Sequence, residues 1–230
     1  AAHGQSMMPE RCAVIFDVDG VLLELTPNEE DIFFAAFAPW GDPSTLSRSW
    51  KSYRIRNDDD IVDEIMERWS IPPAEKSGLV AAYHEALAAR LGDGRLKSEV
   101  IPGAKELLAE ISGRAVLGIA TANFREAARL RLVASGLWDA VATLAHGADG
   151  GGHKHDILAR AIRASGLSPS RIVYIGDNLN DVEAGLRNGV HFIGFSRDAA
   201  RRNQLAAAGA RHVTGNHVES LRFILHSLNA

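Results

Sequence analysis

The chain has 230 residues, 46% hydrophobic and 23% charged, which is ordinary for a globular protein. Its net charge of −4 argues against a nucleic-acid partner, because such proteins normally carry a basic surface. The single cysteine excludes an intramolecular disulfide, and no apolar run reaches the ~18 residues of a membrane-spanning helix.

The N-terminal stretch, residues 1–8, is expected to be a tag or a disordered start, and it contains no apolar signal-peptide core. Together with the composition, this predicts a cytoplasmic protein that has neither membrane nor nucleic-acid partners. The oligomeric state is not predicted.

After the start, short apolar runs alternate with helical patterns. The predicted strands are residues 13–16, 115–120, 141–145, 171–175 and 190–195. The predicted helices are residues 104–111, 125–135, 156–165, 181–188 and 218–228. This alternation predicts an α/β fold with a Rossmann-like, mostly parallel sheet.

The segment 24–99 differs, because it shows helical patterns without strand alternation. Helices are expected at residues 29–37, 60–69 and 74–91, separated by prolines. We therefore predict an all-helical cap, residues 24–99, inserted in a discontinuous core of residues 11–23 and 100–230. Its connections, near residues 24–26 and 96–102, are expected to act as hinges.

Polar residues follow three predicted strands at the point where each strand ends: Asp17, Thr121 and Asp177. In open α/β sheets, ligands bind outside the carboxyl ends of the strands. Asp17 begins the motif DVDGVL, in which Gly20 allows a turn that can bring the Asp17 and Asp19 carboxylates to one site. A solvated turn would also explain this motif when it is taken alone.

A second acidic motif, GDNLND at residues 176–181, directly follows a predicted strand. Asp181 is expected to open the next helix, as an N-cap, as a group facing a metal, or as both. If Asp17, Asp19 and Asp177 converge, two unit charges about 4 Å apart repel by roughly 4 kcal/mol at an effective dielectric of about 20. Such a cluster needs a cation, and oxygen ligands with room for water suit Mg²⁺.

Two further elements suit an anion such as phosphate. Thr121, Ala122 and Asn123 combine a hydroxyl with backbone N–H groups at a predicted helix start, although a simple cap would explain Thr121 equally well. Lys154 follows three glycines at another helix start, which suits a fixed ammonium; a solvated surface charge is the alternative. Its neighbours His153 and His155 are interpreted as loop histidines.

In their order along the chain, DVDGVL, Thr121, Lys154 and GDNLND resemble the motifs of the haloacid-dehalogenase-like superfamily of phosphohydrolases. The helical insertion resembles the cap of its phosphoglycolate phosphatase-like branch. The resemblance implies a Mg²⁺-dependent phosphatase that acts on a small phosphorylated metabolite. A sugar-phosphate mutase and a non-enzymatic binding or regulatory module remain alternatives. Lys51 also leaves a phosphonate hydrolase open.

The resemblance also implies a role for each motif residue. Asp17 would be the nucleophile and a Mg²⁺ ligand, and Asp19 the general acid/base, with its backbone carbonyl on the metal. Thr121 and Lys154 would hold the phosphate, Asp177 would bind Mg²⁺, and Asp181 would support the metal shell.

Two departures from the family pattern lie near the expected site rim. His155 stands where many relatives have proline, and Glu24 and Leu25 stand where relatives often have Asp and Ser or Thr. The segment 51–58 resembles the part of the cap that reaches toward the site in relatives. Arg54 and Arg56 are therefore candidates for binding an anionic substrate, with solvated loop charges as the alternative.

Overall fold

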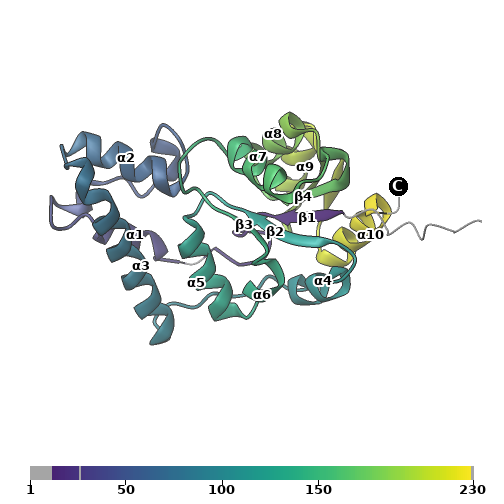
Figure 1. The fold of residues 1–230 in the computed structure, drawn as a ribbon, viewed down its shortest axis with the longest axis horizontal. Helices are drawn as coiled ribbons and strands as arrows, with labels where there is room; N and C mark the ends of the chain where they lie inside the picture. Colours follow the sequence, from purple (N-terminus) through teal and green to yellow (C-terminus); the bar gives the residue numbers. More distant parts are fainter. Residues whose placement is uncertain (1–11, 26, 229–230) are drawn as a thin grey trace, which may run out of the picture.

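The computed structural model describes residues 12–25 and 27–228. Its centre is a six-stranded sheet with strand order β3-β2-β1-β4-β5-β6 and parallel neighbours throughout (Figure 1). The strands are β1 (Ala13–Phe16), β2 (Val116–Ala120), β3 (Leu144–His146), β4 (Ile172–Gly176), β5 (His191–Phe195) and β6 (His212–Thr214). The predicted parallel α/β fold is thereby confirmed.

The strands are apolar because helices cover both faces of the sheet. Val14 and Phe16 of β1 face one core, whereas Ala13 and Ile15 face the other. The first core includes α4 (Ala104–Ile111), α5 (Arg125–Ser135), α6 (Trp138–Val141) and α10 (His217–Leu228). The second includes α7 (Lys154–Ser165), α8 (Leu179–Asn188) and α9 (Ala199–Ala207). Figure 1 shows the two helical layers on opposite sides of the sheet.

Among the described residues, the regular secondary-structure elements between β1 and α4 are all helical. This segment contains α1 (Glu29–Ala35), α2 (Asp58–Arg68), α3 (Lys76–Gly92) and the 3₁₀ turns Pro43–Thr45, Trp50–Ser52 and Pro73–Glu75. Its apolar side chains form a third core, which Phe124 and Ala127 at the start of α5 join. We call this segment, residues 24–99, the helical insertion; its division from the core as a domain stays a prediction.

The two connections of the helical insertion run side by side. The Glu24 N–H donates to the Glu99 carbonyl at 2.9 Å, and the Ile101 N–H donates to the Leu22 carbonyl at 3.0 Å. Gly94 and Gly103 adopt positive φ angles of 74° and 85° near the second connection. This pairing fixes where the chain leaves and re-enters the sheet layer.

Helices α7 and α8 begin two residues earlier than predicted, because a capping box closes each start. His153 and Asn178 are the N-caps, and Asp156 and Asp181 lie at the third helical position. Asp181 therefore does not open its helix. The strand predicted at residues 141–145 is wrong in its first half, since Val141 ends α6 and β3 begins at Leu144.

Across residues 12–25 and 27–228, every helix is too short or too polar to cross a lipid bilayer.

Candidate active site at the carboxyl edge of the sheet

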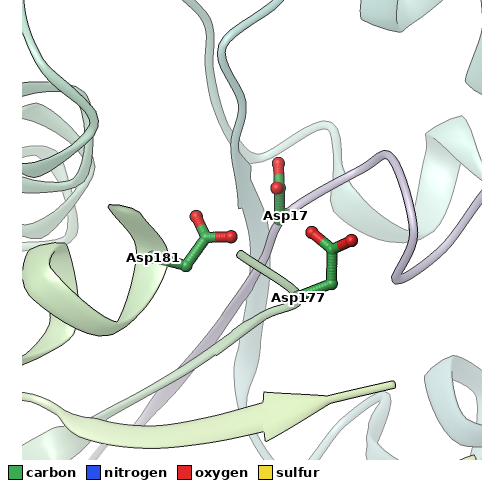
Figure 2. A group of neighbouring side chains, drawn as sticks. All are labelled: Asp17, Asp177 and Asp181. Carbon is green, nitrogen blue, oxygen red and sulfur yellow. The ribbon is translucent and has the colours of Figure 1, made fainter. Parts of the chain in front are cut away.

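Three carboxylates meet at the carboxyl ends of the two central strands. Asp17 follows β1, Asp177 follows β4, and Asp181 lies in the first turn of α8. Each offers an oxygen, and these oxygens all lie within 4.8 Å of one another. Figure 2 shows the three side chains arriving from separate elements around one space. Because β1 and β4 are neighbours in the sheet, two acids far apart in the sequence become adjacent.

Gly20 makes this close approach possible. Its φ is 76°, and a Cβ added there would lie 2.2 Å from Oδ2 of Asp177. An L side chain would therefore be strained in backbone conformation and would also collide with a site carboxylate. The turn predicted at Gly20 brings the loop after β1 against the end of β4.

Lys154 supplies a cation to the cluster from the first position of α7. Its Nζ lies 2.7 Å from Oδ1 of Asp17 and 3.2 Å from Oδ1 of Asp181, and its side chain is only 4% exposed. The alternative of a solvated surface charge is therefore wrong for Lys154. Tyr174 in β4 donates its hydroxyl to Oδ1 of Asp181 at 2.6 Å, a contact that the sequence did not indicate.

Burial and the surplus of carboxylates over ammonium perturb the pKa values of Asp17 and Asp177. Burial raises the pKa of Asp17 well above its usual value; Asp181 and Asp177 add to the rise, while Lys154 opposes it. Burial and Asp181 raise the pKa of Asp177 to about 7. Burial disfavours the charged form of Lys154, but Asp17 and Asp181 outweigh it and raise its pKa. A buried all-oxygen cluster with surplus negative charge fits a hard divalent cation such as Mg²⁺.

The metal-induced rise in melting temperature is expected to grow with pH. The pKa of Asp177 is raised to about 7 in the metal-free folded protein, which therefore favours the protonated carboxyl. The contribution of this group to folding stability is present at low pH and is lost as pH rises through about 7. A cation pairs with the ionised form, so Mg²⁺ should stabilise the protein much more at about pH 8 than at about pH 5.5. Thermal unfolding in chelator and in Mg²⁺ at each pH measures this. Asp177→Asn should reduce the effect, whereas a pH-independent Mg²⁺ shift in the wild type would contradict the site.

The loop after β2 joins Thr121 to Asp19 through Asn123. The Thr121 hydroxyl donates to Oδ1 of Asn123 at 3.1 Å, and the Asn123 amide donates to Oδ2 of Asp19 at 3.3 Å. Ala122 lies on the wall of a cavity that Lys154 also lines. The three candidate phosphate-binding residues of this loop are thus gathered beside Asp19 and Lys154.

The Asp19 side chain takes a different direction from that expected. Its Oδ1 accepts from Nη2 of Arg131 at 2.5 Å, and its Oδ2 accepts from Asn123. The carboxylate cluster is completed by Asp181 instead, so the expected convergence of Asp17, Asp19 and Asp177 side chains is corrected. The Asp19 carboxylate points to a buried guanidinium on α5 instead. Its backbone carbonyl as a metal ligand stays a prediction.

Arg131 is the main residue that the sequence reasoning missed. Its side chain is 1% exposed and lies on the same face of α5 as the buried residues Ala127, Ala128 and Leu132. A charged residue at a buried position of an amphipathic helix needs a partner, and this was the readable signal.

The start of α2 binds both loops beside the site. The carboxylates of Asp58, Asp59 and Asp60 accept backbone N–H groups of Phe124, Gly150 and Gly152 at 2.7, 3.1 and 2.8 Å respectively. Burial raises the pKa of Asp58 well above its usual value, while the Phe124 N–H opposes the rise. The helical insertion therefore contacts the two loops that carry Ala122 and Lys154.

A cavity of about 180 Å³ lies between the helical insertion and the core. Its walls include Arg54, Arg56, Ala122, His153, Lys154, His155 and Asn180. Arg54 also pairs with Glu64 and Glu67 of α2. Among the described residues, no ion pair or hydrogen bond engages the Arg56 side chain, which makes it the more available cation. The histidines beside Lys154 stack with ring centroids 5.4 Å apart.

Comparisons with known proteins agree with this geometry. A model of the haloacid dehalogenase-like hydrolase family matches residues 13–189. A phosphoglycolate phosphatase from Synechococcus elongatus is 26% identical over 197 residues, covering 85% of this chain and 89% of that protein.

Two solved structures share the fold. A predicted phosphoglycolate phosphatase from Haemophilus somnus has a TM-score of 0.66 at 17% identity, covering 95% of this chain and 99% of that one. A proposed β-phosphoglucomutase from Thermotoga maritima has a TM-score of 0.61 at 22% identity, covering 93% and 98% of the two chains. At these identities the likeness shows the fold alone.

Proposed function

Because this chain belongs to the haloacid dehalogenase-like hydrolase family, we propose that it is a Mg²⁺-dependent phosphatase working through an aspartyl-phosphate on Asp17. The chain is an enzyme of the phosphatase class, as the family and the Synechococcus elongatus phosphatase indicate. One observation carries the proposed mechanism. The buried Asp17 carboxylate lies at the carboxyl edge of the sheet, beside one ammonium and two further carboxylates.

The proposed reaction has two steps. An Asp17 oxygen attacks the phosphorus of a phosphate monoester, and the bond to the leaving oxygen breaks as Asp19 donates a proton to that oxygen. Asp19 then takes a proton from a water that attacks the phosphorus of the aspartyl-phosphate, which releases phosphate and restores Asp17. Lys154, Thr121 and the N–H groups of the loop after β2 would hold the phosphoryl oxygens.

A metal would be held by Asp17 and Asp177, by the backbone carbonyl of Asp19, and through Asp181. When bound, Mg²⁺ would supply positive charge that reduces the repulsion between the negative Asp17 carboxylate and the negative phosphoryl oxygens.

We assign the helical insertion, residues 24–99, as a cap domain over the core of residues 11–23 and 100–230. The contacts of α2 with the loops of the core support this assignment. The paired connections of the insertion would serve as its hinges. The cap then closes the cavity that Arg56 and Lys154 line, where a small phosphorylated metabolite would bind. A cytoplasmic location and the absence of nucleic-acid and membrane partners stay predictions from the sequence.

A phosphate-release assay tests this function directly. Purified protein with Mg²⁺ is expected to release inorganic phosphate from one or more members of a panel of phosphorylated metabolites that includes 2-phosphoglycolate and hexose phosphates. EDTA should abolish the release and excess Mg²⁺ should restore it. Full activity in chelator would overturn the metal site. An isomerised phosphate ester without phosphate release would identify a mutase, and no reaction with any ester would favour a binding module.

Arg56→Ala is expected to lower kcat/KM for a metabolite with a second anionic group. One charge-assisted contact is lost, which should cost about 1.5–3 kcal/mol of transition-state binding free energy. It should matter far less for p-nitrophenyl phosphate, which carries no second anionic group. Arg54→Ala is the matched control. It should change kcat/KM for either substrate very little, since Arg54 is already paired with Glu64 and Glu67. Steady-state kinetics of both variants on both esters make the comparison. Small, equal effects of Arg56→Ala would mean that it is a solvated charge.

A further inference from the structure

The guanidinium of Arg131 is buried beside the site, and the proposed reaction gives it no role. Its side chain is 1% exposed, and a charge removed from water to that extent is costly unless it is paired with good geometry. Burial disfavours its charged form, but Asp19 and Glu29 outweigh this effect and raise the pKa of Arg131 further. The arginine is therefore held as a cation inside the protein.

The contacts of Arg131 come from successive stretches of one connection. Nη2 donates to Oδ1 of Asp19 at 2.5 Å, and the same nitrogen lies 3.5 Å from the Glu24 carbonyl. Nε lies 3.3 Å from Oε2 of Glu29, the first residue of α1. The planar fork of an arginine suits such simultaneous contacts, whereas a lysine offers a single point charge. One side chain of the core thus binds the loop after β1, the first connection and the helical insertion.

Asp19 is fixed from two sides as a result. Arg131 takes one carboxylate oxygen and Asn123 takes the other. Without Arg131, this partly exposed carboxylate would be free to adopt other rotamers. A general acid must lie within hydrogen-bond reach of its proton acceptor, and a misplacement of about 1 Å can cost about 10²-fold in rate.

We propose that Arg131 is a positioning residue that fixes the Asp19 carboxylate for proton transfer, and that Glu29 of the helical insertion holds Arg131 in place. The inference rests on the proposed function, because that function gives Asp19 its proton-transfer role. The Glu29 side chain is only 14% exposed and faces Tyr83, Asp19 and Arg131. Correct placement of Asp19 then depends on the helical insertion being seated on the core.

The leaving group of the substrate separates positioning from a general structural role. Glycerol 2-phosphate needs its leaving oxygen protonated, whereas the nitrophenolate of p-nitrophenyl phosphate leaves readily without a proton. Arg131→Gln is expected to lower kcat/KM for glycerol 2-phosphate about 10²-fold, with KM nearly unchanged. The loss for p-nitrophenyl phosphate should be much smaller. A burst of nitrophenolate should appear, because hydrolysis of the aspartyl-phosphate still requires a placed Asp19.

Three further variants complete the test. Arg131→Lys should recover part of the loss, and Glu29→Gln should give the same selective pattern at smaller size. Arg129→Gln is the matched control, since Arg129 lies on the same helix in a surface pair with Glu126. It should leave kcat/KM for both esters unchanged. Thermal unfolding and circular dichroism check that each variant folds. Should Arg131→Gln fail to fold, Arg131→Lys and Glu29→Gln carry the test.

Each outcome has a defined reading. Equal losses on both esters in the folded Arg131 and Glu29 variants, or no loss on either, would overturn the positioning role while leaving the phosphatase intact. A wild-type protein that hydrolyses neither these esters nor any member of the metabolite panel would overturn the proposed function, and with it this inference.

Discussion

Asp17→Asn is expected to reduce phosphate release to the background rate and to leave no phosphorylated protein. An amide is not a useful nucleophile, so the first covalent step cannot occur even if the substrate still binds. Folding should survive the change, because burial and two neighbouring acids raise the pKa of Asp17 and make its ionised form unfavourable in the folded protein. In chelator at neutral pH, the melting temperature of the variant should therefore equal or exceed that of the wild type.

Mass spectrometry of acid-quenched protein measures the adduct directly. Wild-type protein mixed with substrate and Mg²⁺ should show a phosphoryl group on the peptide that contains Asp17. Asp156→Asn is a suitable control, since Asp156 closes the capping box of α7 and its loss should cost about 1 kcal/mol of stability while labelling persists. A phosphorylated Asp17→Asn protein would show that the nucleophile is assigned to the wrong residue.

Much of the fold can be predicted from the sequence because buried parallel strands have a clear pattern. The apolar run at β1 reflects helices on both faces of the sheet, and the missing alternation before α4 reflects a segment built only from helices. The short edge strand β6 was not predicted, because three residues carry too little periodicity. Helix starts at α7 and α8 depended on capping boxes, which move a boundary by two residues without changing the apolar pattern.

The candidate site shows where sequence reasoning ends. Asp17, Thr121 and Asp177 could be found because each follows a strand, and parallel strands bring their carboxyl ends to one edge. The direction of the Asp19 carboxylate could not be found this way, since its partner Arg131 lies 112 residues away. The sequence also could not predict which of Arg54 and Arg56 is engaged in ion pairs. That depends on which arginine lies against Glu64 and Glu67 once α2 has formed, and the structure places Arg54 there.

Asp19→Asn is expected to slow turnover by roughly 10²–10⁴-fold, the usual range for a lost general acid/base, while phosphate binding persists. The nucleophile is still present, so p-nitrophenyl phosphate should still transfer its phosphoryl group to Asp17. The later hydrolysis lacks its base, and the aspartyl-phosphate should accumulate. Rapid-quench labelling and the nitrophenolate burst measure both steps.

Comparison with Asp17→Asn distinguishes the nucleophile from the general acid/base. Both variants should have little steady-state turnover, but only Asp19→Asn should become phosphorylated. Asp19→Asn should also lose stability, because the buried Arg131 exchanges a carboxylate partner for a neutral amide while Glu29 remains its other anion. Arg131→Lys, which keeps both acids, should lie between wild type and Asp19→Asn in the rate of aspartyl-phosphate hydrolysis. Normal turnover by Asp19→Asn would show that Asp19 does not transfer the proton. Equal losses of activity toward alkyl and nitrophenyl phosphate esters, without accumulation of the aspartyl-phosphate, would show the same.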